Sequence, residues 1–490
     1  MMTRLRPLAL AAVLFFGLSG CDKFLDVQPR YVQDAENYFN QPSDYEMALT
    51  AAYDLLQTSF LTQWIGEIAS DNAIAGGESV TDTEGLHQIE AMTHNAVNNE
   101  LRSIFRWNYA GIARVNYLME FKDKIDFPGK EGLIGQARFL RAYYYFELTK
   151  YFGDVPLVID ERLGADQVTK LDRSPAADVY AQIEADLRYA SATLPWSNPE
   201  KGRVDKGAAL ALLGKVQLYQ GKHAEAAISL DSVINFGGFA LVENYADLWF
   251  DANENNSETV FDIEYSGLEG GSYGCFVCLE GNAAAGFNGI RQYDGPYYSD
   301  GNSYNLPTQD LYDAFDSGDP RRDITVLDLD AFIAAQANPS SISYAIGGGG
   351  HTGFYNNKYI KRQAELGLPD NDLTSPLNYK VIRFADVLLM AAECHAQEGN
   401  DVQAQTYLNE VRNRVSMPVI TSSGAALLED IYTERRLELS GEGLRFWDLV
   451  RSGQAAQSIS NFQTGKHERF PLPQVEIDLA GGQWAQNTGY

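Results

Sequence analysis

Helical periodicity is the feature that most restricts what this chain can fold into. Residues 134–156 read IGQARFLRAYYYFELTKYFGDVP, and Gly153 and Pro156 end the pattern. Apolar and aromatic side chains recur there at intervals of three and four residues along one wide stripe: Phe139, Leu140, Tyr143, Tyr144, Phe146, Leu148 and Tyr151. A stripe this wide predicts a helix that is packed on two sides.

Two later segments repeat a helix, turn, helix plan. Residues 206–237 predict two helices joined by a tight turn at Gly221, and residues 382–415 predict two more with Gly399 at the turn. Small residues such as Gly214 resemble, in kind and spacing, those that let the helices of a tetratricopeptide repeat close against each other.

Further helices of similar length are predicted within residues 102–152 and 176–194. The spacing of the helical segments is irregular and long inserts separate them. The predicted fold class is therefore mostly α, a decorated array of helix pairs rather than a regular solenoid.

The sequence between the helical blocks differs from them in composition and periodicity. Residues 265–310 are rich in Gly, Asn, Asp and Tyr and show almost no helical period, and a loop region this long inside a compact protein is usually functional. A shorter stretch of this kind, residues 69–88, follows the helix that carries Trp64. We therefore expect helical-repeat blocks near residues 45–240 and 380–415, and a loop-rich, ligand-binding insert near residues 241–375.

The N-terminus has the layout of a secretory signal. Arg4 and Arg6 precede an uncharged run, residues 8–18, which is too short for a transmembrane helix of about 20 apolar residues. The sequence LSGC, residues 18–21, resembles the bacterial lipobox, in which the cysteine is acylated and the chain is cut before it. The resemblance implies that residues 1–20 are removed and that Cys21 carries the lipid anchor. The alternative is an ordinary signal with a chance cysteine.

Charge and composition restrict the partners. A formal net charge of −28 argues against nucleic acid, whose phosphates are bound by Lys and Arg. With 45% hydrophobic residues, the 490-residue chain can bury a large core in more than one packing unit. No later segment approaches the length of a membrane span, so the lipid is the only anchor that the sequence indicates.

Six blocks along the chain resemble one family in the family's order. They are CDKFLDVQP, RFLRAYYYFELTKYFGDVPLV, NLPTQDLYDAFDSGDPRR, YKVIRFADVLLMAAECHAQEGN, ERRLELSGEGLRFWDLVRSG and FPLPQVEIDLAGGQWAQNTGY, and together they run from residue 21 to residue 490. The family is that of the SusD/RagB-like outer-membrane nutrient-binding lipoproteins of Bacteroidetes.

The resemblance implies a mostly α fold with about four tetratricopeptide-like helix pairs and an irregular, loop-rich C-terminal portion. It also implies a surface-exposed lipoprotein of the outer membrane that binds oligosaccharides or another nutrient. The ligand would then pass to a SusC-like TonB-dependent transporter. We expect no catalytic residue, no bound metal and no cofactor.

Candidate binding residues follow from the chemistry of sugars. A sugar ring presents a flat patch of C–H groups with hydroxyls at its rim, so it needs exposed aromatic planes flanked by amides and carboxylates. Tyrosines within the helical stripes are expected to pack in the core. The candidates are therefore in or beside the two loop regions: Trp64, Asp71, Asn72, Tyr273, Asn288, Arg291, Tyr293, Asp294, Tyr297, Tyr298 and Tyr304.

Two other function classes remain open. A polysaccharide-degrading enzyme needs a pair of carboxylates in a cleft, and the charged residues between Glu434 and Asp448 could supply one. Their i, i+3 and i+4 spacing beside Trp447 instead predicts ion pairs at the rim of a packed helix. A helical-repeat adaptor for other proteins would not need a tyrosine-rich insert. The insert therefore favours a glycan or nutrient binder.

Cysteine spacing leaves one alternative open. Cys275 and Cys278 form a CxxC that is either a short disulfide in a Gly-rich loop or two free thiols. A zinc site would need a second cysteine pair or a histidine pair at fixed spacing, and the sequence has neither.

A calcium loop is a weaker possibility. Asp251, Asn253, Asn255 and Asp262 fall at calcium-loop positions, but Asn256 stands where the sharp turn prefers Gly, and the last ligand is Asp rather than Glu. A solvated turn is therefore the favoured interpretation of this segment.

Overall fold

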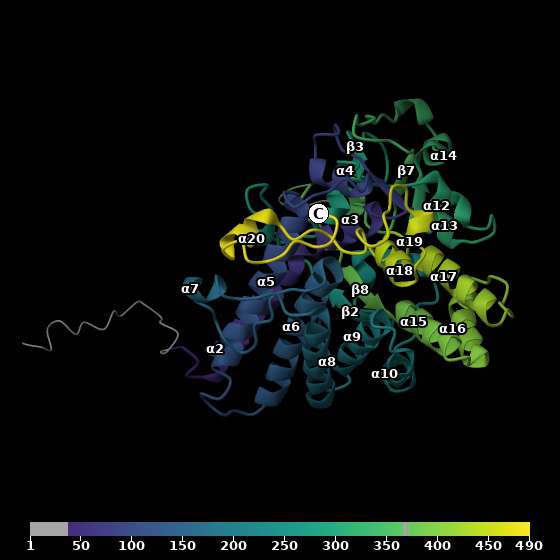
Figure 1. Ribbon diagram of the computed structural model, residues 1–490. Coiled ribbons are helices and arrows are strands. Elements are labelled where there is room, and N and C mark those ends of the chain that lie inside the picture. Colours follow the sequence, from purple (N-terminus) through teal and green to yellow (C-terminus); the bar gives the residue numbers. More distant parts are fainter. Residues whose placement is uncertain (1–37, 366–369, 371) are drawn as a thin grey trace, which may run out of the picture.

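The computed structural model describes residues 38–365, 370 and 372–490, so the predicted signal and Cys21 lie outside the described residues. Helices dominate the structure (Figure 1), which confirms the predicted mostly α class. The long helices are α2 (Pro42–Asp54), α5 (Asn99–Glu120), α6 (Lys130–Phe152), α8 (Ala176–Thr193), α9 (Lys206–Tyr219), α10 (His223–Phe236), α15 (Phe384–Gln397), α16 (Asp401–Arg414) and α17 (Ala425–Leu439).

The long helices form one continuous array. Helices that follow each other along the chain also pack together: α5 on α6, α6 on α8, α8 on α9 and α9 on α10. Helix α10 then packs on α15, although the whole insert separates these two helices in the sequence. The chain therefore leaves the array after α10, builds the insert, and returns to the position next to the helix that it left.

Helix α6 lies at the centre of the array. Every side chain from Phe139 to Phe152 is buried, because α2, α5 and α8 all pack against this helix. The ring of Phe139 also meets that of Phe261 edge to face, with their centroids 4.9 Å apart. The wide apolar stripe of the sequence is thus explained by packing on more than one side.

Glycines set the turns and the close approach within the helix pairs. Gly221 and Gly399 have φ values of +70° and +75°, which other residues rarely adopt. In Gly214 of α9, an added Cβ would lie 2.6 Å from the Cγ atom of Leu230 in α10. The small residues that the sequence places at these points therefore allow the helices to turn and to pack closely.

The remaining helices of the described residues are short. They are η2 (Leu55–Ser59), α3 (Phe60–Ile68), α4 (Glu84–Glu90), α7 (Ala165–Val168), η3 (Tyr245–Trp249), η4 (Asp251–Asn253), η5 (Phe276–Cys278), α11 (Ala283–Phe287), α12 (Gln309–Ala314), α13 (Arg321–Thr325), α14 (Leu329–Ala334), η6 (Pro339–Ser341), η7 (Gln363–Glu365), α18 (Arg445–Arg451), α19 (Ala455–Ser458) and α20 (Gln474–Leu479).

Short strands organise the insert. Antiparallel pairs join β1 (Ala73–Ala75) to β5 (Asn305–Pro307), β2 (Thr259–Ile263) to β8 (Tyr379–Arg383) and β6 (Val326–Asp328) to β7 (Phe354–Asn356), and β3 (Ile290–Arg291) lies parallel to β4 (Asp300–Gly301). The β2–β8 pair closes the base of the insert. Strand β8 takes residues 382–383 from the predicted helix, which begins at Phe384.

The insert is more ordered than its loop-like sequence suggests. It has a hydrophobic core of its own that includes Ile290, Leu306, Leu327 and Tyr355. The predicted loop at residues 69–88 likewise contains β1 and the start of α4. Periodicity could not reveal β1, because a strand of three residues shows no repeat.

A buried ion cluster joins the insert to the helical array. Glu438 of α17 binds the guanidinium groups of Arg321 at 2.9 Å, Arg383 at 2.5 Å and Arg414. Arg383 also binds Glu258 at 2.7 Å and Glu442 at 2.9 Å. We define the buried ion cluster by six charged side chains: Glu258, Arg321, Arg383, Arg414, Glu438 and Glu442. Three further buried charges extend it, since Asp319 and Glu434 pair with Arg321 and Lys358 pairs with Glu442.

The prediction that the charges near residue 438 form ion pairs is confirmed, but the partners expected from the i+3 and i+4 spacing and the expected position at a helix rim are both wrong. The spacing of charges along α17 can predict pairs only within that helix. It cannot predict the arginines of distant segments that pack against α17 in the folded protein. Burial by itself would raise the pKa of Glu438, but Arg414, Arg383 and Arg321 hold this pKa well below its usual value. The Glu438 carboxylate therefore stays ionised in the interior.

We predict that Glu438→Gln lowers the free energy of unfolding by about 3–5 kcal/mol, because it leaves buried arginines without their counter-charge. The measurement is chemical denaturation of the wild-type and variant proteins. Glu120→Gln is the control, because Glu120 pairs with Arg162 at 2.6 Å on the surface, where such a pair contributes about 0–1 kcal/mol. Equal losses in the two variants would contradict the proposed role of the cluster.

Candidate functional site

Five aromatic rings form a continuous layer from the core to the surface, which we call the aromatic platform: Trp64, Tyr273, Phe276, Phe287 and Tyr304. The ring of Phe287 lies 5.2 Å from that of Trp64 and 5.2 Å from that of Tyr304, on which it stacks. Tyr273 is 6.3 Å from Phe287 and 6.4 Å from Phe276. Exposure rises from 4% for Trp64 to 57% for Tyr273.

Trp64 and Asn288 support the platform from beneath. Trp64 belongs to α3, in which every residue is buried. Its indole N–H donates to the Asn288 Oδ1 atom at 3.0 Å, and the Asn288 side chain donates to the Tyr359 carbonyl at 3.1 Å. The expectation that Trp64 and Asn288 are exposed to ligand is therefore wrong, because neighbouring segments cover both side chains.

Two carboxylates orient the outer tyrosines. The Tyr273 hydroxyl donates to Asp372 at 3.0 Å, and the Tyr304 hydroxyl donates to Asp82 at 3.0 Å. Burial, and then the charge of Asp372, raises the pKa of Tyr273 to about 12. Burial and the Asp82 charge raise the pKa of Tyr304 as well. Both hydroxyls therefore remain protonated donors at neutral pH, and the carboxylates keep free lone pairs for other donors.

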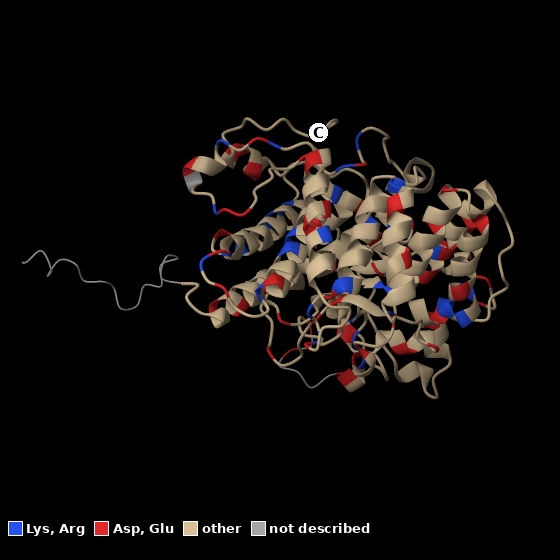
Figure 2. Ribbon diagram, turned by 90° about the horizontal axis from the view of Figure 1, so that it is seen from below, with Lys and Arg blue, Asp and Glu red and all other residues tan. Residues whose placement is uncertain are grey.

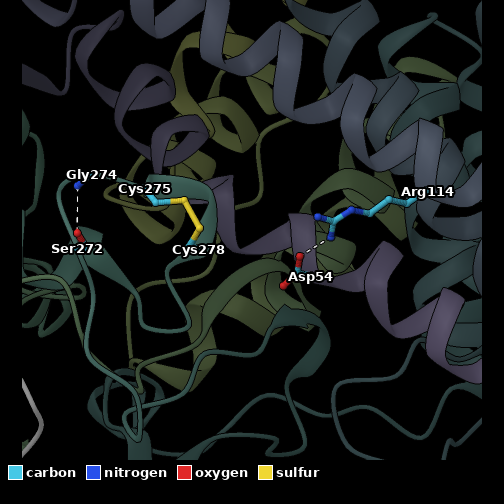
Figure 3. Close-up of a disulfide and its surroundings, with 6 residues drawn as sticks. All are labelled: Asp54, Arg114, Ser272, Gly274, Cys275 and Cys278. Carbon is cyan, nitrogen blue, oxygen red and sulfur yellow. Dashed lines mark hydrogen bonds and ion pairs between the residues drawn. A yellow bond between two sulfur atoms is a disulfide. The ribbon is translucent and has the colours of Figure 1, made fainter. Parts of the chain in front are cut away.

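The turn that carries Phe276 is closed by a disulfide. Figure 3 shows the bond between Cys275 and Cys278. The Gly274 N–H donates to the Ser272 hydroxyl oxygen at 3.2 Å on the approach to the turn. In this structure the CxxC is thus a crosslink beside the platform, and the sequence alone had left it open between a disulfide and two thiols.

A run of glycines supports the opposite edge of the platform. A Cβ added to Gly347 or Gly349 would lie 2.0 or 2.2 Å from the backbone oxygen of Gly77 or Gly76. This close approach holds residues 75–79 beside Tyr304. At the same edge Arg291 pairs with Glu78 at 2.9 Å.

Sequence reasoning missed several residues of this site. Its candidates omitted Phe276, Phe287, Asp82, Asp372 and the glycines that begin at residue 347. The sequence IGGGG at residues 346–350 could have indicated a close backbone approach, since only Gly fits such a contact. The aromatic and acidic residues gave no signal, because they come from segments far apart in the chain.

A second group of candidates lies in the core of the insert. Tyr293 and Tyr298 are buried there, and their hydroxyls donate to the Pro296 carbonyl at 2.9 Å and to the Asn357 side chain at 3.1 Å. The expectation that they are exposed is wrong, because the insert needs their rings for its own core. Tyr297, 47% exposed, and Asp294 remain on the surface.

Asp71 and Asn72 also make hydrogen bonds within the protein. Arg445 donates two hydrogen bonds to Asp71, both 2.8 Å long. Arg436 donates to the Asn72 Oδ1 atom at 2.9 Å, and Asn72 is fully buried. These side chains tie the end of α3 to α17 and α18, so the prediction that they face a ligand is wrong for Asn72 and leaves only part of Asp71 accessible.

The possible calcium loop does not form. Asp262 is buried on β2, and its carboxylate binds the Lys380 ammonium at 3.1 Å. Within the part of the chain that the structure describes, no group of three or more His, Cys, Asp or Glu side chains could hold a metal ion. No helix among the described residues is long and apolar enough to cross a membrane.

The architecture defines a class of protein: a helical-repeat array with a long insert that presents an aromatic platform. Comparison with known proteins places the chain within this class. Residues 255–469 match the model of the SusD family, and residues 23–218 match a family described as starch-binding and associating with the outer membrane. A solved laminarin binding SusD-like protein is 34% identical, with a TM-score of 0.84 over 91% of this chain and 99% of that chain. The chain belongs to the SusD family.

Two further relatives agree with this assignment. Surface glycan-binding protein A from Bacteroides fluxus is 26% identical, with a TM-score of 0.80 over 92% of this chain and 100% of that chain. SusD-like protein P2 of Formosa agariphila is 26% identical over 98% of each chain.

Proposed function

We propose that this protein is a non-enzymatic, lipid-anchored surface protein that binds oligosaccharides at the aromatic platform. The observation that carries the proposal is the exposed ring of Tyr273, with its hydroxyl bound to Asp372 and the second outer tyrosine, Tyr304, close by. The C–H face of a sugar can pack on such a ring while its hydroxyls bond to the flanking carboxylates. The laminarin binding relative supports this ligand class.

The inner rings explain how such a surface could bind with little loss of order. Trp64 and Phe287 hold Tyr304 from below, and the disulfide turn holds Phe276 at the side. A ring that is already fixed loses little conformational entropy when a ligand binds. We infer that Asp82 and Asp372 act as hydrogen-bonding partners in binding rather than as a catalytic acid and base.

The proposal includes delivery to a SusC-like TonB-dependent transporter. A surface-anchored binder whose described helices include none that could span a membrane needs a partner to move its ligand inward. Family membership and the description of the matching model as associating with the outer membrane support this location. The lipid on Cys21 would hold the protein there.

We predict that Tyr273→Ala weakens binding of laminarin oligosaccharides by about 1–3 kcal/mol, by analogy with aromatic hot-spot residues. Tyr273→Phe keeps the ring and should lose less. Isothermal titration calorimetry measures the affinity, and melting temperature verifies the fold.

Tyr297→Ala is the matched control, because Tyr297 is a similarly exposed tyrosine whose ring contacts Tyr298 of the insert core and not the platform. Equal loss of affinity in Tyr273→Ala and Tyr297→Ala would place the site elsewhere. Release of reducing sugar by the wild-type protein would contradict the non-enzymatic part of the proposal.

We predict that Cys21→Ala leaves the fold intact and moves the protein out of the membrane fraction. One acyl chain gives only marginal membrane binding, so the several chains of a bacterial lipoprotein are what should retain it. Fractionation and mass spectrometry of the mature N-terminus measure the result. A Cys21→Ala variant that keeps a lipid and stays in the membrane fraction would refute the anchor assignment.

We also predict that the wild-type protein co-purifies with a TonB-dependent barrel from native outer membranes in mild detergent. Affinity purification and mass spectrometry would identify the barrel, and the Cys21→Ala variant serves as the comparison that lacks membrane retention. Purification of the anchored protein alone, repeated across growth substrates, would contradict the delivery step.

A further inference from the structure

A polar cavity of about 460 Å³ lies where the C-terminal segment meets the end of α6 and the start of α8. We call it the tail pocket. Its charged lining residues come from three separate segments, Asp154, Arg173, and Lys466 with Glu468 and Arg469, and a fourth segment contributes Asn487. It shares no lining residue with the aromatic platform.

Three cations line the tail pocket without a salt bridge. Arg173, Lys466 and Arg469 make no ion pair within 4.0 Å with any acidic side chain that the structure describes. The chain has 66 acidic and 38 basic residues, and acidic positions are spread along most of the ribbon (Figure 2). Three neighbouring cations that form no ion pair with an acidic side chain are therefore unusual in the described part of this protein.

Arg469 and Lys466 have most of their hydrogen-bonding capacity unused, whereas every side-chain nitrogen of Arg173 already donates. Arg173 donates to neutral oxygens: the Asp154 carbonyl at 2.9 Å, the Ala485 carbonyl at 2.6 Å and the Asn487 side chain at 2.6 Å. Arg469 donates from one nitrogen to the Glu468 carbonyl at 2.7 Å. The Lys466 ammonium lies 4.7 Å from the centroid of the Tyr490 ring.

The two carboxylates of the pocket are turned to backbone groups. Asp154 accepts a hydrogen bond from the Ala176 N–H at 2.8 Å, and Glu468 accepts from the Gly465 N–H at 2.9 and 2.8 Å. They moderate the positive potential without contacting the cations. The tail pocket is thus lined by three cations that no carboxylate contacts directly.

We propose that the tail pocket binds an oxyanion, the phosphate or sulfate group of a small ester. The forked donors of Arg469 match the oxygens of such a group, and Lys466 and Arg173 add positive charge. The volume of the cavity exceeds that of the group itself, so a sugar-sized body can accompany it. A bound oxyanion would join the α6–α8 connection to the C-terminal segment and stabilise both.

The test is thermal unfolding and calorimetry with millimolar sodium phosphate and sodium sulfate, against sodium chloride at equal ionic strength. The wild-type protein should show a saturable rise in melting temperature with the oxyanions. Lys466→Gln and Arg469→Gln should each weaken binding about tenfold, the effect of one lost charge-assisted contact. Lys201→Gln, which removes an exposed cation from another cavity, should leave binding unchanged.

A response that is absent in the wild-type protein, or equal in all three variants, would overturn the proposal. Glucose 6-phosphate and phosphatidylglycerol vesicles distinguish the source of the oxyanion: tighter binding of the sugar ester assigns a soluble ligand, and binding to the vesicles alone assigns a lipid headgroup. Tyr273→Ala should keep the phosphate response, so a failure of the aromatic platform and a failure of the tail pocket are separable results.

Discussion

The rest of the structure depends on the buried ion cluster around Arg383 and Glu438. Arg383 is the last residue of β8 and immediately precedes α15, so one guanidinium group fixes both the base of the insert and the point where the chain re-enters the array. Its ion pairs with Glu258, Glu438 and Glu442 join β8 to residue 258 before β2 and to residues 438–442 at the end of α17, which lie far apart in the sequence. Desolvating these charges is costly unless all of them are paired, so the arrangement strongly disfavours alternative packings.

The same cluster positions the aromatic platform. Glu442 lies in the turn after α17, and the Gly443 N–H of this turn donates to Glu67 of α3 at 2.7 Å. The side chain of Gln63 donates to the Gly441 carbonyl at 3.0 Å from the same helix. Trp64 lies between these two contacts in the sequence. The innermost ring of the platform is therefore held by the turn that the ion cluster fixes.

This connection explains why the platform can lie at the surface and still be rigid. Its outer rings, Tyr273 and Tyr304, are oriented by carboxylates from other loops, and its inner rings belong to helices that are anchored in the core. The tail pocket has a different basis, since neutral oxygens hold its most constrained cation, Arg173, and no carboxylate pairs with it among the described residues. One site is thus built on aromatic packing and the other on unpaired charge.

The sequence by itself determined the helical array, because period, glycine turns and small residues such as Gly214 act locally. It also determined the family, through blocks in a fixed order. Only the tertiary structure decided which loop aromatics are exposed: Trp64 and Tyr298 are covered by distant segments, while Tyr273 is not. The tertiary structure likewise decided that Asp71 forms an ion pair with Arg445 and that Asp372 accepts a hydrogen bond from the Tyr273 hydroxyl. A local pattern reports that a residue is polar or aromatic, but burial and pairing depend on partners that long-range folding brings together.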